Sequence, residues 1–276
     1  MLVAAVQLTS KANKKKNLAV ATALMLRAVR QGAELIALPE YFSFIGAKPE
    51  MFKEAERSKD GAAYRMVREF AKAHGVYILA GSIPTITEKG SDKKSTRLLN
   101  RSILFNPSGE EVVSYDKIHL FDSDLEETRA YRESETFRPG GELRVVDTPF
   151  GKVGLSVCYD LRFPELYRSM TLKGARIIFV PAAFTEYTGK DHWLALLKAR
   201  AIENQVFIIA PAQFGKHAEK KSSYGKSCVI DPWGNIIALA PDCETVIVAD
   251  IDFKFLAKVR KELPVLKHYR KDLFQL

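Results

Sequence analysis

Four landmarks occur twice in this chain of 276 residues, in the same order in each half. Each pair shares its length, its apolar pattern or its turn residues. The pairs are residues 2–7 and 153–157, GAELIALP at Gly32 and GARIIFVP at Gly174, VYILA at Val76 and VFIIA at Val206, and Asn-Pro-Ser-Gly at Asn106 and Asp-Pro-Trp-Gly at Asp231. Such self-similarity indicates a duplicated supersecondary unit, so the fold must accommodate two copies of one layered arrangement.

Each unit is predicted to have the order β-α-β-α-β-β. Apolar residues at helical spacing predict a helix over residues 14–31, and a second helix is expected over 63–73. Residues 192–204 are the predicted helix at the equivalent place in the second half. The two turn sequences predict hairpins, the first between strands at 101–105 and 112–115. A polar stretch at residues 88–94 is expected to be a loop.

The repeat predicts an α/β fold with four layers. Each unit has a sheet with helices on one face, which leaves the other face apolar and in need of cover. Packing the two bare faces together gives an α-β-β-α sandwich with an internal pseudo-two-fold repeat. We therefore expect one domain over residues 1–276, and the alternative is an open doubly wound sheet, which is favoured if the repeat is coincidental.

Composition and charge exclude several classes of protein. No apolar run approaches the roughly 18 residues that a membrane span requires, and the first residues lack the basic region of a signal peptide. We expect no membrane association. Lys and Arg exceed Asp and Glu by 42 to 33, but the basic residues form only small clusters without interleaved aromatic residues, so nucleic acid is not an expected partner. The charge instead favours a small anionic substrate.

The cysteines and glycines predict neither a disulfide framework nor a cofactor. Three cysteines without paired spacing indicate free thiols in a reducing compartment, with the cytoplasm as the default location. A zinc site requires clustered Cys and His, whereas Cys228 and Cys243 are expected in a strand and a turn, far apart. No glycine-rich phosphate loop is present, so no nucleotide cofactor is predicted.

A cysteine lies where a β-favouring run gives way to a predicted helix start, in the stretch KVGLSVCYDLRFPELYRSM at residues 152–170. A tight bend there would lift the side chain of Cys158 from the core and direct backbone N–H groups, such as that of Tyr159, at the same point. A nucleophile needs this exposure, a positive potential that favours the thiolate, and donors for an oxyanion. The alternative is that Cys158 is a small buried hydrophobe, as most free cysteines are.

Two further residues follow predicted strands at equivalent places. Glu40 follows the strand at 34–38, and Lys117 follows the strand at 112–115. Because ligands bind at the carboxyl ends of strands in α/β sheets, these residues and Cys158 can converge on one edge. A carboxylate would take the thiol proton and later activate water, and a lysine would hold a negative oxygen. Considered separately, each residue also has a non-catalytic interpretation. Glu40 would be a solvated residue at a strand end, and Lys117 would be a basic residue at the surface.

Three segments resemble the signatures of a known family. LPEYF around Glu40, YDKIHLF around Lys117 and GLSVCYDLRFPEL around Cys158 are similar to the three motifs of the nitrilase superfamily of carbon-nitrogen hydrolases, and the likeness covers nearly the whole chain. The resemblance implies a Glu-Lys-Cys catalytic set and an α-β-β-α sandwich. It also places a further family glutamate on Glu133, to position the substrate or share proton transfer, where the alternative is a loop acid.

Within this superfamily the chain most resembles the deaminated glutathione amidase branch. The segments AQFGKHAEKKSSYGKS, VIDPWGNIIA and CYDLRFPELYR carry this likeness. The related omega-amidases are less similar after Ala210. Both branches act on small amides of a dicarboxylic 2-oxo acid, which implies a cation for the free carboxylate. Arg162 is the candidate, because its planar guanidinium binds a carboxylate through two bonds. The alternative is that Arg162 pairs with Glu165 or Asp160.

The branch pattern also implies residues that line the substrate pocket. Phe184 and Thr188 are expected there, on the loop before His192. His192 is predicted to begin a helix, where it would cap the helix or line the pocket. His119 and His217 lack a recognisable orienting partner for Cys-His catalysis.

The resemblance implies cleavage of a linear amide through a cysteine thioester. Omega-amidase and aliphatic nitrilase activities are the alternatives, since amides and nitriles share the thiolate attack, and a carbamoyl-amine hydrolase fits less well. The non-enzymatic alternative is a binding protein that keeps this fold but has lost catalytic turnover. The family usually pairs through helices that flank the nucleophile, so a homodimer or higher homo-oligomer is expected, and the tail at residues 264–276 is predicted either to reach a partner subunit or to be disordered.

Overall fold

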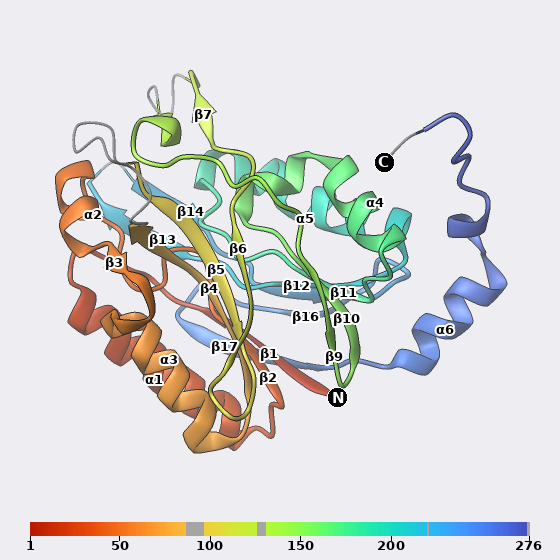
Figure 1. Ribbon diagram of the computed structural model, residues 1–276, viewed down its shortest axis with the longest axis horizontal. Coiled ribbons are helices and arrows are strands. Elements are labelled where there is room, and N and C mark those ends of the chain that lie inside the picture. The colour runs from red at the N-terminus through yellow and green to blue at the C-terminus, as the bar shows by residue number, and fades with distance from the viewer. Residues whose placement is uncertain (87–96, 126–130, 220, 275–276) are drawn as a thin grey trace.

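The chain folds into four layers, with helices outside and two sheets between them (Figure 1). The computed structural model describes residues 1–86, 97–125, 131–219 and 221–274. The loop expected at residues 88–94 lies outside the described residues. The sheets confirm the predicted α-β-β-α sandwich and exclude the single open sheet.

The first sheet combines parallel and antiparallel strands in the order β17-β1-β2-β4-β5-β6, with β3 beside β4. Strands β1, β2 and β4 are parallel, and their outer neighbours are antiparallel to them. The strands are β1 (Leu2–Gln7), β2 (Leu35–Ala37), β3 (Glu56–Arg57), β4 (Tyr77–Ile86), β5 (Leu99–Phe105), β6 (Glu111–Asp116) and β17 (Thr245–Asp250).

The second sheet repeats this pattern in the order β16-β15-β12-β11-β10-β9. Strands β10, β11 and β12 are parallel, and β9, β15 and β16 are added antiparallel. The strands are β9 (Val145–Thr148), β10 (Gly151–Leu155), β11 (Ile177–Phe179), β12 (Phe207–Ala210), β15 (Cys228–Ile230) and β16 (Ile236–Leu239). The predicted repeat is therefore confirmed, and each sheet also has an antiparallel edge strand, β17 beside β1 or β9 beside β10, that the sequence reasoning missed.

The described helices are α1 (Lys14–Arg30), α2 (Lys48–Glu54), α3 (Ala62–His74), α4 (Pro164–Leu172), α5 (Glu186–Asn204) and α6 (Phe253–Glu262). Helices α1 and α3 cover the outer face of the first sheet and α4 and α5 that of the second, whereas α6 extends past the end of the sheets (Figure 1). The predicted helices at 14–31 and 63–73 are confirmed. The prediction that a helix begins at His192 was wrong, because α5 begins at Glu186. Thr185 caps it by accepting a hydrogen bond from the backbone N–H of Thr188, so His192 lies in the second turn.

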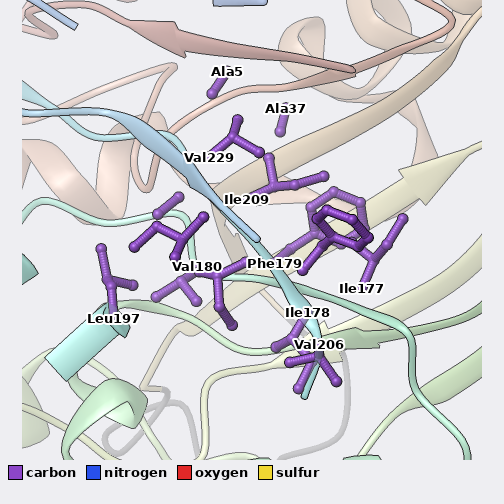
Figure 2. Close-up of a cluster of buried hydrophobic side chains, with 14 of the residues drawn as sticks. Ala5, Ala37, Ile177, Ile178, Phe179, Val180, Leu197, Val206, Ile209 and Val229 are labelled. Carbon is purple, nitrogen blue, oxygen red and sulfur yellow. The ribbon is translucent and has the colours of Figure 1, made fainter. Parts of the chain in front are cut away.

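Alternate residues of the strands face the two sides of each sheet. Ala5 and Ala37 of the first sheet join Phe179, Ile209 and Val229 of the second in one buried cluster between the sheets (Figure 2). Their neighbours in sequence point the other way and contact the helices; for example, Val6 and Ile36 are buried with Ala21 and Met25 of α1. This period of two is what allows one face of each sheet to meet the other sheet.

Two small hairpins lie outside the main sheets. They are β7 (Asp122–Ser123) with β8 (Tyr131–Arg132), and β13 (Phe214–Ala218) with β14 (Lys221–Tyr224). After α6 the chain forms a short 3-10 helix, η5 (Val265–Lys267), and runs away from the sandwich in Figure 1. Residues 275–276 lie outside the described part, and the homo-oligomer stays a prediction.

Gly81 in β4 lets the segment that carries Glu40 approach the sheet. A Cβ at this position would lie 1.8 Å from the carbonyl oxygen of Leu38 and 2.6 Å from that of Pro39. Because backbone atoms must move to accept a methyl group here, we expect Gly81→Ala to lower the free energy of unfolding by about 3 kcal/mol or more in urea titrations.

Gly141 provides the matched control for this substitution. A Cβ there meets nothing within 4 Å and its φ lies outside the left-handed region, so Gly141→Ala should change stability by less than about 0.5 kcal/mol. Equal unfolding midpoints for the two variants would contradict the close approach of Gly81 to Leu38.

No described helix is both long and apolar enough to cross a membrane.

Candidate active site

Cys158 lies at a tight bend between β10 and α4. It begins a 3-10 helix, η4 (Cys158–Arg162), and its φ of 49° is in the left-handed region that residues other than glycine rarely adopt. The backbone N–H of Cys158 donates to the carbonyl of Pro181 at 2.9 Å, which fixes this conformation. The side chain is only 8% exposed, but it borders a cavity. The expected strand-to-helix bend is therefore confirmed, and its strained residue is the candidate nucleophile.

Asp160 holds this bend against the segment that carries Lys117. Its buried carboxylate accepts hydrogen bonds from the backbone N–H of Val157 at 2.8 Å, from the hydroxyl of Tyr115 at 2.7 Å and from the backbone N–H of His119 at 2.9 Å. These bonds join β6, the loop after it and the cysteine bend into one unit. They also occupy Asp160, so the structure excludes the alternative in which it pairs with Arg162.

Lys117 lies between two buried carboxylates. Its Nζ donates to Oε1 of Glu40 at 3.1 Å and to Oε2 of Glu133 at 2.8 Å. All three side chains are at most 2% exposed. Glu133 also accepts from the hydroxyl of Tyr41 at 2.9 Å and from the backbone N–H of Phe121 at 2.7 Å. Glu133 is thus a buried member of the cluster and not a solvated loop acid.

Glu40 is held rigidly by donors from several elements. Asn100 of β5 donates to Oε1 at 2.8 Å, and the backbone N–H of Ala183 donates to Oε2 at 2.8 Å. The carbonyl of Glu40 accepts from the side chain of Gln213 at 2.9 Å. These bonds exclude the alternative in which Glu40 is a solvated strand end, and they fix one carboxylate beside both Lys117 and Cys158.

The charges of the cluster set the resting state of the thiol. Burial raises the pKa of Cys158 well above its usual value, the carboxylate of Glu40 raises it further, and Lys117 opposes both. Burial would lower the pKa of Lys117, but Glu133 and Glu40 more than offset it, and that pKa is well above its ordinary value. Lys117 therefore supplies the expected positive charge, but burial and Glu40 outweigh its effect on this pKa. A neutral thiol beside a hydrogen-bonding carboxylate needs a base to become a nucleophile.

The three predicted residues meet from two sheets. Glu40 follows β2 and Lys117 follows β6, both in the first sheet, whereas Cys158 follows β10 of the second. The expectation of one sheet edge is corrected accordingly. The carboxyl ends of these strands lie at the same end of the sandwich, because the two halves repeat the same strand directions.

The thiol borders two connected hollows. A cavity of about 220 Å³ is lined by Glu40, Lys117, Glu133 and Cys158 together with Tyr131 and Lys221. A smaller one of about 20 Å³ shares Cys158 with it and is also lined by Arg162, Phe184 and Thr188. Three of the four residues predicted to bind substrate, Arg162, Phe184 and Thr188, thus line a hollow beside the thiol, and their binding roles stay predictions.

Arg162 is available to an anion. Its guanidinium lies over the rings of Tyr159, at 5.7 Å, and Phe184, at 5.2 Å. His192 Nδ1 is 3.4 Å from its nitrogens. Within the described ranges no acid pairs with Arg162, so neither Glu165 nor Asp160 neutralises it. His192 thus contacts Arg162 but lines neither hollow.

Several residues of the site escaped the sequence reasoning. Asn100, Tyr41, Tyr131 and Lys221 were not predicted. Asn100 could have been found, because it is a polar residue within the buried strand β5, and Tyr41 adjoins Glu40 with a left-handed φ of 54°. Tyr131 lies two residues before Glu133, and Lys221 lies within the segment AQFGKHAEKKSSYGKS that carries the branch likeness, but neither follows a predicted strand as Glu40, Lys117 and Cys158 do.

The described residues do not contain a cluster of His, Cys, Asp and Glu that could hold a metal. Cys228 is buried in β15 and Cys243 is exposed in the turn before β17, where they were predicted. The backbone N–H of Tyr159 lies in the first turn of η4, where amides have no partner within the helix. It therefore stays the candidate second donor to an oxyanion.

Comparisons with known proteins agree with this architecture. The family model described as Carbon-nitrogen hydrolase matches residues 2–261. The deaminated glutathione amidase of Synechocystis sp. (strain PCC 6803 / GT-S) is 44% identical over 269 residues, 97% of each chain, and that of Mus musculus is 40% identical over 99% of this chain and 84% of its own. The crystal structure of the C. elegans NitFhit protein has a TM-score of 0.91 at 36% identity, covering 99% of this chain and 66% of that one.

Proposed function

The chain belongs to the carbon-nitrogen hydrolase family, whose members cleave non-peptide carbon–nitrogen bonds, and on this premise we propose that it is an amidase for deaminated glutathione that works through a thioester on Cys158. The observation that carries the proposal is one cavity that joins a cysteine to a buried lysine held by two buried carboxylates. The relatives that are named as deaminated glutathione amidases support the substrate.

The first half of the reaction forms the thioester. Glu40 takes the proton of the Cys158 thiol, and the sulfur attacks the amide carbon to form a C–S bond. The carbonyl oxygen becomes an oxyanion that receives donors from Lys117 Nζ and the backbone N–H of Tyr159. When the oxyanion collapses, the C–N bond breaks and Glu40 returns the proton to the leaving amine. Glu133 keeps Lys117 in place for this step.

The second half releases the acid. Glu40 takes a proton from water, whose oxygen attacks the thioester carbon, and collapse of this intermediate breaks the C–S bond. The sulfur leaves as a thiolate and regains the proton through Glu40. Glu40 thus acts first as a base and then as an acid in both halves. It can do so because its hydrogen bonds hold it beside Cys158.

The acyl half of the substrate is a 2-oxo dicarboxylic acid whose free carboxylate needs a cation. Arg162 supplies it in the smaller hollow, since its guanidinium is unpaired among the described acids and is flanked by aromatic rings. Phe184 and Thr188 line the same hollow; in this proposal Phe184 contacts the chain of the acid and the Thr188 hydroxyl binds the 2-oxo group.

Purified protein should be assayed with deaminated glutathione, 2-oxoglutaramate and an aliphatic nitrile, with released cysteinylglycine or ammonia measured. We expect the highest kcat/KM for deaminated glutathione. A clear preference for 2-oxoglutaramate would identify an omega-amidase, and turnover of the nitrile alone a nitrilase. Absence of product from all three would overturn the amidase proposal in favour of a binding protein.

A further inference from the structure

Lys221 is a cation of the larger cavity that the proposed reaction steps do not use. It is the first residue of β14, is partly buried, and lines the same cavity as Cys158 and Glu40. Its Nζ lies 5.4 Å from the centre of the Tyr131 ring. Within the described part of the chain, no acid forms an ion pair with it. A cation without a counter-ion that lines a cavity is a binding group for an anion.

The hairpin that carries Lys221 is fixed to the active-site wall. The hydroxyl of Ser222 donates to Oε2 of Glu186 at 2.7 Å. His217 of β13 bridges the hairpin to the segment after β1, with Nδ1 2.8 Å from the carbonyl of Ser10 and Nε2 2.9 Å from the hydroxyl of Ser223. Lys221 is therefore held on a supported strand, so its position along the cavity is defined.

Burial removes water from the ammonium group of Lys221, so an anion in the cavity would stabilise its charged form. This burial lowers the pKa of Lys221, while the more distant charges of Glu40 and Glu133 oppose that effect. A carboxylate that entered the cavity would replace the lost hydration of the ammonium group.

The position of Glu40 decides which half of a substrate meets Lys221. Glu40 lines the larger cavity and not the smaller hollow that contains Arg162. The group that protonates the leaving nitrogen must reach that nitrogen, so the leaving amine lies in the larger cavity. The larger cavity, of about 220 Å³, is also the one with room for cysteinylglycine.

We infer that the larger cavity is the site of the leaving amine and that Lys221 binds the carboxylate at the far end of that amine. The inference rests on the proposed function, since deaminated glutathione has two carboxylates, one in each half. Arg162 then binds the carboxylate of the acyl half and Lys221 that of the dipeptide half, and Cys158 borders both hollows. Lys221 is thus a specificity-determining residue for amides whose leaving group ends in a carboxylate.

The test compares deaminated glutathione with its C-terminal amide, which has the same acyl half and nearly the same size. For the wild-type protein we expect kcat/KM to be at least about tenfold higher for the acid, mainly through KM. Lys221→Met should bring this ratio close to one by slowing the acid alone, and Lys221→Arg should retain much of it. Hydrolysis of 2-oxoglutaramate, whose leaving group is ammonia, should fall far less in Lys221→Met than hydrolysis of the acid.

Two matched controls separate this role from others. Lys216→Met removes an exposed lysine from β13 of the same hairpin and should leave the acid-to-amide ratio unchanged. Arg162→Met should slow the acid and the amide by the same factor. Equal rates for acid and amide in the wild type, or an unchanged ratio in Lys221→Met, would overturn the inference, as would an equal loss on all substrates. A wild-type protein that cleaves neither compound would instead refute the proposed function itself.

Discussion

Replacement of Cys158 by alanine is expected to abolish amidase turnover, with a fall in kcat of about 10⁵-fold or more. The sulfur is the only atom of this side chain that can form the thioester, and the neighbouring carboxylates cannot replace it because both are held by Lys117. The substitution leaves the fold intact in this account, since the bend is fixed by the backbone bond to Pro181 and by Asp160. Release of cysteinylglycine from deaminated glutathione measures the effect.

Cys228→Ala is the matched control for loss of a buried thiol. Cys228 lies in β15 and lines neither hollow, so this variant should keep kcat within a factor of about two, despite a loss of stability of about 1 kcal/mol. Circular dichroism should show the same fold for both variants. If Cys158→Ala retained activity within tenfold of the wild type, the assignment of the nucleophile would be wrong.

Replacement of Glu40 by glutamine is expected to lower kcat by about 10³-fold, within the range that general acid–base groups contribute. The amide cannot accept the thiol proton, protonate the leaving amine or activate water. The same change should make Cys158 more acidic, because burial and the negative charge of Glu40 raise the pKa of that thiol and only the charge is removed. Alkylation by iodoacetamide at pH 7 should therefore become faster as turnover is lost.

These opposite changes distinguish a base from a residue that merely shapes the site. A local collapse would slow both alkylation and turnover. Glu135→Gln is the control, since Glu135 belongs to the same 3-10 turn as Glu133 but is exposed and pairs with Lys48; it should change neither rate. Slower alkylation of the Glu40→Gln variant, or a kcat within tenfold of the wild type, would contradict the role of Glu40.

The layered fold could be predicted because its strongest signals are local and repeated. The apolar runs at β2 and β11, each ended by a proline, and the hairpin turns at Asn106 and Asp231 recur at matching places. The edge strands β17 and β9 were missed, because they are strands only through their hydrogen bonds to β1 and β10. β17 in particular is brought from the far end of the chain to pair with β1, and no local pattern reports such a pairing.

The candidate site could be predicted as a set of residues but not as an electrostatic system. Glu40, Lys117 and Cys158 each follow a strand, which marks them in the sequence. The protonation of Cys158 depends on how completely the cluster is buried and on which carboxylate lies nearest, and these are properties of the packed sandwich. For the same reason Lys221 was not recognised as a site residue, although its segment carries the branch likeness, since only the packing of its hairpin brings it to the cavity.

The central claim is that the acyl group passes through Cys158, and mass spectrometry of the Glu40→Gln variant tests it most directly. The variant should be mixed in excess with deaminated glutathione, quenched in acid at intervals and measured intact and after digestion, with free cysteinylglycine measured in the same samples. Because the substitution also makes Cys158 more acidic, acylation should slow less than the attack of water, and the protein should gain the mass of one 2-oxoglutaryl group per cysteinylglycine released, on the peptide that contains Cys158. Release of cysteinylglycine together with free 2-oxoglutarate while the protein stays unmodified, or an adduct on another residue, would contradict the account.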